Sequence, residues 1–332
     1  MDGAVLVTGG AGYIGSHAVL ALCDAGHKVV VVDNLVTGFA WAVDPRATLI
    51  EANIEDAQVR DIIRGHGVKA ILHFAGSVVV PESVSDPLKY YRNNTAASRT
   101  LIEHAVAGGV RHFIFSSTAA TYGIPESVPV REEMPTRPIN PYGMSKLMTE
   151  AMLRDVAAAH PINFCALRYF NVAGADPQGR SGQSTAGATH LIKVAVEAAT
   201  GKRDAVSIFG DDFATADGTG VRDYIHVTDL ADAHLHALAL LAERPGESHI
   251  LNCGYGRGYS VLEVLDAVDR VTGGTITRRR EGRRAGDPDA LIADNSAILA
   301  ALSWRPRHDD LDTIVTHALA WERRLAERNA SA

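Results

Sequence analysis

Residues 4–15 read Ala-Val-Leu-Val-Thr-Gly-Gly-Ala-Gly-Tyr-Ile-Gly, and this stretch decides the fold. Its first five residues have the composition of a buried strand, and apolar residues at helical spacing follow from Tyr13. Gly9, Gly12 and Gly15 stand between the two. Glycine permits the tight turn, lets the backbone approach a pyrophosphate and allows the helix to pack close to the strand. The stretch therefore predicts a strand–turn–helix unit whose helix N-terminus binds phosphate, although glycine-rich turns also occur for packing alone.

The next strand adds a second sign of nucleotide binding. Residues 28–33 (Lys-Val-Val-Val-Val-Asp) are predicted to form a buried strand that ends at Asp33, 18 residues after Gly15. A carboxylate there accepts hydrogen bonds from a ribose 2′-hydroxyl and repels a 2′-phosphate. An aspartate can also cap a strand end without any ligand. Together, the three glycines and Asp33 predict a site for NAD rather than NADP.

Strands and helices alternate through the first half of the chain. We expect further strands at residues 70–74, 112–116 and 163–169, with helices at 56–64, 87–107 and 141–160 between them. Because these strands are continuously apolar rather than alternating, the sheet they form is expected to be parallel and covered on both faces. The fold class is therefore α/β, a doubly wound parallel Rossmann sheet with a smaller C-terminal α/β substrate domain.

The composition and the periodicity of the sequence change after Asn171. A loop is expected at 174–187, followed by elements at 191–200 (helix), 205–209 (strand), 228–242 (helix), 249–253 (strand) and 260–271 (helix), then a basic strand-like segment and two helices. We place a domain boundary near residue 175. Residues 1–175 then form the NAD-binding Rossmann domain, and residues 176–332 mainly bind the substrate, with some segments returning to the first domain.

Composition excludes several classes of protein. The 332 residues include 32 basic and 39 acidic ones, a net charge of −7, without the Lys/Arg-rich run that a nucleic-acid partner requires. The arginines at 278–280 and 283–284 form one basic spot that suits a single phosphate group. The three cysteines are far apart, so we expect buried free thiols and no metal site. No stretch approaches the roughly 18 apolar residues of a membrane span or has the pattern of a signal peptide, so we expect a cytoplasmic protein without a membrane partner.

Tyr142 and Lys146 are four residues apart at the start of a predicted helix and share one face. A free tyrosine has a pKa near 10, so it needs help to act as a base at neutral pH. A neighbouring ammonium stabilises the phenolate, and a bound nicotinamide ring adds positive charge. Upstream, residues 115–123 (Phe-Ser-Ser-Thr-Ala-Ala-Thr-Tyr-Gly) follow a strand, where the Thr118 hydroxyl can bridge a substrate oxygen to the tyrosine. Alone, a Tyr/Lys pair at this spacing is far more often part of an exposed helix face.

With these motifs the sequence resembles the extended short-chain dehydrogenases/reductases, and within them the UDP-glucose 4-epimerases most closely. The resemblance covers nearly the whole chain. Its most specific pieces are residues 8–16, 73–76, 116–123, 142–146, 167–171, 218–227 and 283–288. It implies that hydride passes from C4 of a UDP-hexose to tightly bound NAD and returns to the other face of a 4-keto sugar, interconverting UDP-glucose and UDP-galactose. It also implies a homodimer, formed through the helices at 87–107 and 141–160.

The resemblance implies a role for each matching residue. Tyr142 would be the acid/base for the sugar 4-hydroxyl, Lys146 would lower its pKa and hold the nicotinamide ribose, and Thr118 stands where the family usually has serine. NAD contacts are implied for Gly9, Gly12, Tyr13, Ile14, Gly15, Asp33, Asn34, Asn53, Ile54, Phe74, Ala75, Gly76, Asn93, Tyr142, Lys146 and Phe170. Nucleotide-sugar contacts are implied for Thr118, Tyr142, Asn171, His190, Leu191, Phe209, Arg222, Arg284, Asp287 and Leu291.

Three positions depart from the family pattern. Asn53 stands where an aspartate commonly contacts adenine, and its amide can still donate and accept. Val78 replaces a lysine that often follows the Phe-Ala-Gly segment, which removes one cofactor contact. Leu291 falls where residue size helps to decide whether an N-acetyl group fits, and leucine is intermediate in size.

Alternative functions stay open. They are an epimerase for N-acetylated or pentose UDP-sugars, a UDP-sugar decarboxylase, and a non-catalytic NAD-binding regulator. The nucleotide-sugar 4,6-dehydratases share the fold and the Tyr/Lys pair but carry Asp-Glu after the catalytic threonine. Here those positions are Ala119 and Ala120, which cannot transfer protons. This pair of residues excludes dehydration.

Overall fold

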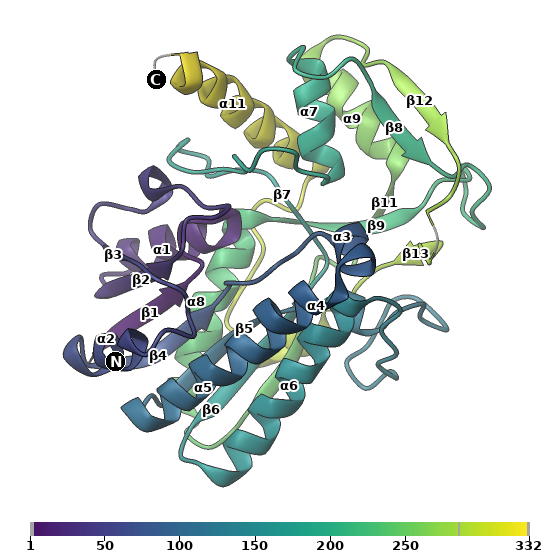
Figure 1. Ribbon diagram of the computed structural model, residues 1–332. Helices are drawn as coiled ribbons and strands as arrows, with labels where there is room; N and C mark the ends of the chain where they lie inside the picture. The colour runs from purple at the N-terminus through teal and green to yellow at the C-terminus, as the bar shows by residue number, and fades with distance from the viewer. Residues whose placement is uncertain (1–2, 285, 331–332) are drawn as a thin grey trace.

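The structure, a computed structural model, describes residues 3–284 and 286–330, and its centre is a seven-stranded parallel sheet (Figure 1). The strands in order across the sheet are β10 (His249–Cys253), β6 (Asn163–Tyr169), β5 (His112–Thr118), β4 (Val68–His73), β1 (Ala4–Thr8), β2 (Val29–Asp33) and β3 (Thr48–Glu51). The order turns back at β1, which pairs with β2 on one side and β4 on the other. The expected doubly wound Rossmann sheet is therefore confirmed.

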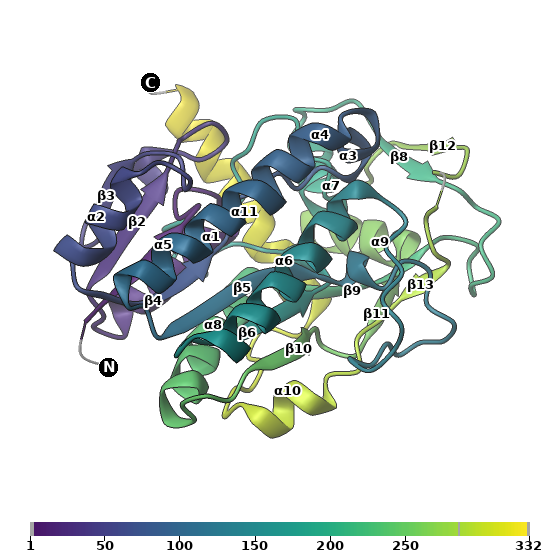
Figure 2. The ribbon, with the colours of Figure 1, turned by 60° about the horizontal axis from the view of Figure 1, so that its bottom comes forward.

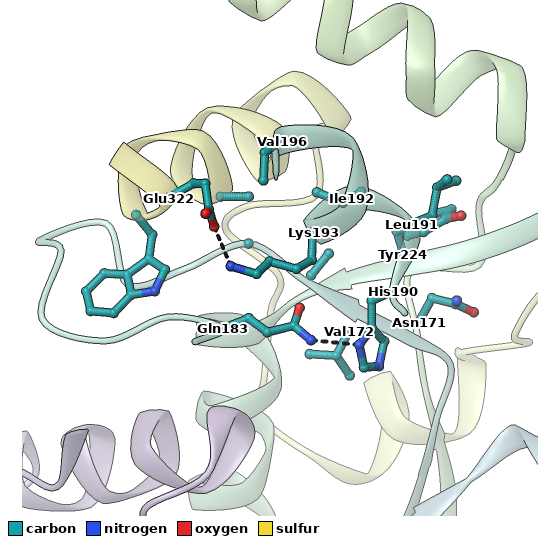
Figure 3. Close-up of a pocket in the computed structure, with 14 residues that line it drawn as sticks. Asn171, Val172, Gln183, His190, Leu191, Ile192, Lys193, Val196, Tyr224 and Glu322 are labelled. Atoms are coloured by element: carbon teal, nitrogen blue, oxygen red, sulfur yellow. Dashed lines mark hydrogen bonds and ion pairs between the residues drawn. The ribbon is translucent and has the colours of Figure 1, made fainter. Parts of the chain in front are cut away.

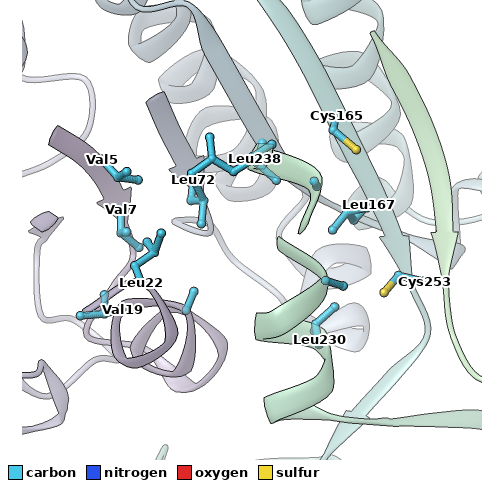
Figure 4. Packing of buried hydrophobic residues seen from close by; sticks show 14 of the residues in the cluster. Val5, Val7, Val19, Leu22, Leu72, Cys165, Leu167, Leu230, Leu238 and Cys253 are labelled. Carbon is cyan, nitrogen blue, oxygen red and sulfur yellow. The ribbon is translucent and has the colours of Figure 1, made fainter. Parts of the chain in front are cut away.

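Helices cover both faces of this sheet (Figure 2). One apolar cluster joins it to α1 (Tyr13–Asp24), α8 (Val227–Glu243) and α10 (Ser296–Ala301). Figure 4 shows its packing, with side chains of β1 and β4 such as Val5 and Leu72 near Leu22 of α1 and Leu238 of α8. A second cluster joins the opposite face to α2 (Gln58–Gly65), α5 (Ala97–Gly108) and α6 (Pro141–Ala159). The double cover explains why the strands are apolar throughout.

The predicted helix at 87–107 is divided into three parts. They are α4 (Pro87–Tyr90), a π-helical turn (Tyr91–Ala96) and α5, preceded by the short helix α3 (Val80–Ser85), which the sequence did not predict. In the wide turn, the side chains of Asn93 and Asn94 bond with Ser77 at the end of β4. Single π-turns of this kind are frequent at functional sites.

The C-terminal half contains two small sheets. Strand β9 (Val221–His226) pairs with β7 (Asn171–Ala173), β11 (Gly258–Ser260) and β13 (Ala290–Leu291), and β8 (Val206–Phe209) pairs with β12 (Arg278–Glu281). The helices α7 (Leu191–Ala199), α9 (Val261–Thr272) and α11 (Leu311–Ala330) share one apolar cluster with them. We did not predict β9, because its sequence, Val-Arg-Asp-Tyr-Ile-His, mixes charged and apolar residues.

Two of our sequence expectations concern the whole chain. The cysteines are free and buried, as predicted, at positions Cys23, Cys165 and Cys253. Across residues 3–284 and 286–330, every helix is too short or too polar to cross a membrane.

Candidate functional site

The glycine-rich turn lies at the carboxyl end of β1 and has no room for side chains. Gly9 has φ +71°, and a Cβ atom there would lie 2.6 Å from the Ala75 nitrogen. A Cβ atom at Gly15 would overlap the Gly9 carbonyl oxygen. Helix α1 begins after Gly12, without a side-chain cap and without an acidic residue in its first turn. Its free N–H groups and dipole therefore suit the pyrophosphate of a dinucleotide.

Asp33 is held beside this turn. Its buried carboxylate accepts hydrogen bonds from the backbone nitrogens of Ala11 (2.9 Å) and Leu35 (2.8 Å). Next to it, the Asn34 amide donates to the Asn53 side chain at 3.0 Å, and Ile54 is buried. The structure thus gathers the residues predicted to bind the adenosine end of the cofactor around one strand end.

The end of β4 forms the next part of the site. The backbone nitrogens of Phe74 and Ala75 both donate to the Thr8 carbonyl oxygen, at 3.0 and 3.1 Å, so this segment lies against the glycine-rich turn. Gly76 has φ +155°, and a Cβ atom there would lie 2.8 Å from Oδ1 of Asn94.

Asn94 is a residue that sequence reasoning missed. Its side chain accepts from the Ser77 nitrogen at 2.7 Å and donates to the Ser145 hydroxyl at 3.1 Å. It therefore joins the segment after Phe74 to α6. No feature of the sequence distinguishes Asn94 from its predicted neighbour Asn93, whose amide donates to the Ser77 hydroxyl at 3.0 Å.

The start of α6 positions the predicted acid/base. Asn140 caps the helix by accepting from the Gly143 nitrogen at 2.8 Å, and Pro141 fits its first turn, so Tyr142 stands at a fixed helix end. Burial raises the pKa of Tyr142, and a hydrogen bond with the Thr118 side chain opposes that shift. The structure therefore brings the Tyr142 and Thr118 side chains together, as predicted from the sequence.

Lys146, one helical turn beyond Tyr142, is buried. Its buried ammonium donates to the Ser116 carbonyl oxygen at 2.9 Å and lies 5.0 Å from the centroid of the Phe115 ring. Burial lowers the pKa of Lys146 to about 8. The bond with Thr118 is what lowers the Tyr142 pKa in this structure. The roles expected of Lys146, which are to lower that pKa further and to hold the nicotinamide ribose, stay predictions.

A buried ion pair below these residues was also missed. Glu150 lies one turn beyond Lys146 and accepts from Arg168 Nε at 2.9 Å and Nη2 at 2.6 Å, and also from the Ser117 hydroxyl. Arg168 donates in turn to the Tyr122 hydroxyl at 2.9 Å. The spacing of Tyr142, Lys146 and Glu150 was the available signal, since four-residue steps keep all three on one helix face.

Three of the predicted nucleotide-sugar residues line one pocket (Figure 3). Asn171, His190 and Leu191 share it with Gln183 and Lys193. The Gln183 amide lies 2.7 Å from Nδ1 of His190, and burial lowers the pKa of that histidine. Lys193 is buried in an ion pair with Glu322.

The other nucleotide-sugar residues lie around β9 and β13. Arg222 pairs with Asp287 and stands opposite Leu291 in the sheet register. The Arg284 guanidinium carbon lies over the Phe209 ring, 3.7 Å from its centroid. Each arginine thus lies beside another residue that is predicted to contact the nucleotide-sugar.

Leu291 also lies close to the end of β5, where the predicted catalytic residue Thr118 stands. It packs with Phe170 against a small buried cluster that contains Ala119 and Tyr122, directly after Thr118. This cluster connects the nucleotide-sugar group to the end of β5.

The expected basic spot is smaller than predicted. Arg278 pairs with Asp269 (2.5 Å), Arg280 with Asp211 (2.5 Å) and Arg283 with Asp212 (2.6 Å). The aspartates neutralise these arginines, so the expectation that residues 278–280 and 283–284 act as one phosphate-binding spot is wrong for these three. Charge counts along the sequence cannot show such pairing.

Comparison with known proteins agrees with this geometry. The profile of the NAD dependent epimerase/dehydratase family matches residues 5–254. A UDP-glucose 4-epimerase of Azospirillum brasilense is 56% identical over 324 residues, which cover 97% of this chain and 93% of the relative.

Solved structures agree as well. The UDP-glucose 4-epimerase of Stenotrophomonas maltophila, crystallised with NAD and formylated UDP-arabinopyranose, superposes with a TM-score of 0.95 at 38% identity, covering 98% of this chain and 100% of that one. The UDP-Glc/GlcNAc 4-epimerase of Campylobacter jejuni has a TM-score of 0.85 at 47% identity, covering 97% and 100%. This chain therefore belongs to the NAD dependent epimerase/dehydratase family, within its UDP-glucose 4-epimerases.

Proposed function

We propose that this chain is an NAD-dependent isomerase that interconverts UDP-glucose and UDP-galactose. One observation carries the proposal: the Tyr142 and Thr118 side chains meet at the carboxyl end of β5, on the same sheet edge as the glycine-rich turn and beside the cluster that contains Leu291. Ligands of open α/β sheets bind at this edge, where the strand order reverses. A cofactor on one side and a nucleotide-sugar on the other would meet at these hydroxyl groups.

Each residue then has a defined task. Tyr142 takes the proton of the sugar 4-hydroxyl and later returns one, while Thr118 orients the same oxygen. Bound NAD would supply the acceptor that takes hydride from C4 and gives it back to the opposite face of the ring. Lys146 holds β5 through the Ser116 carbonyl and keeps a positive charge near the phenolate that forms.

The remaining predicted contacts follow the same division. The glycine-rich turn and α1 would hold the pyrophosphate, Asp33 the adenosine ribose, and the segment from Phe74 to Gly76 the nicotinamide half. Arg222 and Arg284 would bind the diphosphate, because a planar guanidinium matches phosphate oxygens. We propose on this basis that residues 1–175 mainly bind NAD and residues 176–332 mainly bind the UDP-sugar.

The substrate range is proposed to extend beyond hexoses. A similar protein is named for both Glc and GlcNAc, and another was crystallised with a UDP-pentose derivative. Leu291 is partly exposed beside Phe170, at the position that we expect to limit the sugar. Its intermediate size supports a site that accepts UDP-glucose first and larger or smaller sugars more slowly.

We also propose a homodimer in the cytoplasm. Apolar side chains point outward on α3, α4 and α6, where Val84, Leu88 and Met148 are 65%, 77% and 40% exposed. Exposed apolar residues on neighbouring helices support an interface there. The three buried free thiols support a reducing compartment.

The direct test is to incubate the purified protein with UDP-glucose, UDP-GlcNAc and UDP-xylose separately, without added NAD, and to resolve the 4-epimers by chromatography. UDP-galactose from UDP-glucose is the expected product. If no substrate is epimerised even after NAD is supplied, the proposal fails, and the decarboxylase and NAD-binding regulator become the leading alternatives.

A further inference from the structure

The loop that follows Asp33 lies on the glycine-rich turn. Phe39 donates its backbone N–H to the Ala11 carbonyl oxygen at 3.0 Å, and a Cβ atom at Gly38 would lie 2.8 Å from the Ala11 carbonyl carbon. Because Asp33 and Asn34 begin this loop, its position decides whether the predicted adenosine contacts are in place. Within the loop itself, the ring of Trp41 packs against the ring of Phe39, with centroids 5.1 Å apart.

A second loop reaches the same turn from the other side. The Ser181 hydroxyl lies 2.7 Å from that of Ser16, which directly follows Gly15 in α1. Arg180, beside it, pairs with Asp24 at the end of α1 at 2.8 Å. Both ends of α1 are therefore tied to residues 180–181.

Trp321 of helix α11 touches both loops. Its ring stacks on that of Trp41 with centroids 6.2 Å apart, and its Nε1 donates to the Ser184 hydroxyl at 3.2 Å. Gly182 lies so close to this ring that a Cβ atom would overlap it. Arg328, two turns further along α11, covers Trp41 with its guanidinium carbon 4.0 Å from the ring centroid. Figures 1 and 2 show α11 beside the loop after β2.

We infer that Trp41 and Trp321 are positioning residues that hold these two loops on the glycine-rich turn and so slow the release of NAD. The inference rests on the proposed function, because it requires NAD at that turn. Release of the cofactor requires the loop that follows Asp33 to move. That movement would break the stack between Trp41 of the loop and Trp321 of α11. This contact supplies retention that does not depend on a lysine at position 78, where Val78 is 52% exposed.

The test measures the exchange of bound NAD rather than turnover. The protein is loaded with isotopically labelled NAD, chased with excess unlabelled NAD, and sampled by filtration. Trp41→Ala is expected to release label about tenfold faster, because an aromatic stack and a cation–π contact are lost together. Trp41→Phe keeps a ring and is expected to exchange at close to the wild-type rate.

Val315→Ala is the matched control. Val315 is buried on the same helix but packs in the C-terminal cluster, away from Trp41, so the variant loses stability without losing the stack. It is expected to melt earlier and to exchange NAD at the wild-type rate. The inference is overturned if Trp41→Ala exchanges at the wild-type rate, or if Val315→Ala exchanges as fast as Trp41→Ala. Failure of the proposed function has a different signature, a wild-type protein that retains no label at all.

Discussion

At the scale of single residues, the proposed reaction depends on the hydroxyl proton of Tyr142. Burial raises the pKa of this group, which disfavours the phenolate, and the bond with Thr118 works in the opposite direction. The ring of Tyr90 packs edge-on against that of Tyr142, with centroids 6.4 Å apart, and fixes its orientation. An acid/base in this setting needs both the threonine and nearby positive charge to function at neutral pH.

Removal of that hydroxyl should therefore slow turnover strongly while binding remains. Tyr142→Phe is expected to lower kcat by about 10²- to 10⁴-fold, the usual contribution of a general acid/base. NAD and UDP binding, measured by calorimetry, should hardly change, because the ring and its packing stay. Turnover at the wild-type rate would remove Tyr142 from the mechanism.

Arg284 allows a second test at this scale. In the structure its guanidinium rests on the Phe209 ring rather than on a carboxylate, unlike the paired arginines at 278, 280 and 283. Arg284→Ala is expected to raise the KM for UDP-glucose about tenfold with little change in kcat, because it loses a charge-assisted bond to phosphate. Arg280→Ala, on the neighbouring strand β12, is the control that should behave as wild type, because Arg280 pairs with Asp211. An unchanged KM in Arg284→Ala would place this arginine outside the site.

At the scale of elements, α6 and β5 act as a pair. Tyr142 meets Thr118, Lys146 bonds to Ser116, and Glu150 bonds to Ser117, so three successive helical turns are fixed to three successive strand residues. The Glu150–Arg168 ion pair anchors the far end of this arrangement. Buried charges of this kind do little for stability on balance, but they fix one register between elements.

Ser117→Ala tests this register with a small change. The variant removes the hydroxyl that joins β5 to Glu150 and leaves the ion pair with Arg168 intact. We expect kcat to fall about threefold to tenfold at constant KM, and the pH profile of kcat to move to higher pH as the Thr118–Tyr142 bond loosens. A variant that melts earlier but keeps the wild-type pH profile would show that Ser117 serves stability alone.

The strands show which elements could be predicted from the sequence and which could not. Continuous apolar strands and the glycine-rich turn were enough to predict the Rossmann sheet, because burial on both faces leaves a local signature. Strand β9 escaped prediction because Arg222 and Asp223 interrupt its apolar pattern. Asp223 is nevertheless buried and accepts from the Tyr255 and Gly256 nitrogens, at 3.0 and 2.9 Å. Satisfaction of a buried carboxylate by distant backbone groups is a tertiary property that no local pattern carries.

The residues of the site also fall into a predictable and an unpredictable group. Tyr142, Thr118 and the glycines could be predicted because spacing and motif carry their chemistry. Asn94 and Trp321 could not be, since each acts through partners far along the chain. The spacing of Glu150 from Lys146 placed it on the right helix face, but its pairing with Arg168 of β6 had no local signal.

At the scale of the whole molecule, buried histidines make stability depend on pH. His73 illustrates the cause. The Ser98 hydroxyl donates its proton to the Asn94 carbonyl oxygen at 2.5 Å, so the same hydroxyl accepts from Nε2 of His73 at 2.8 Å. Nδ1 of His73 then accepts from the Thr8 hydroxyl at 2.7 Å. The ring is therefore neutral, and burial lowers its pKa to about 3. Burial also lowers the pKa of His234 to about 4.

Acid should consequently unfold the protein early. A histidine with a lowered folded pKa binds a proton only in the unfolded state between pH 6.5 and its folded value, so stability falls as pH falls through that window. Each such group contributes about 1.4 kcal/mol per pH unit. Denaturant unfolding at pH 7.5, 6 and 5 should show a declining free energy of unfolding. His234→Phe should flatten the decline, and His160→Gln, an exposed control, should not; a free energy that stays constant between pH 7.5 and 5 would contradict this prediction.

In the proposed function, a cofactor half and a nucleotide-sugar half meet at Tyr142 and Thr118, and the C4 hydrogen leaves the sugar and returns to it. The most direct measurement uses UDP-glucose deuterated at C4, with the product analysed by NMR and mass spectrometry in ordinary water. We expect UDP-galactose that retains deuterium at C4, because the hydrogen moves as a hydride, which does not exchange with solvent. Loss of the deuterium to water during epimerisation would contradict it.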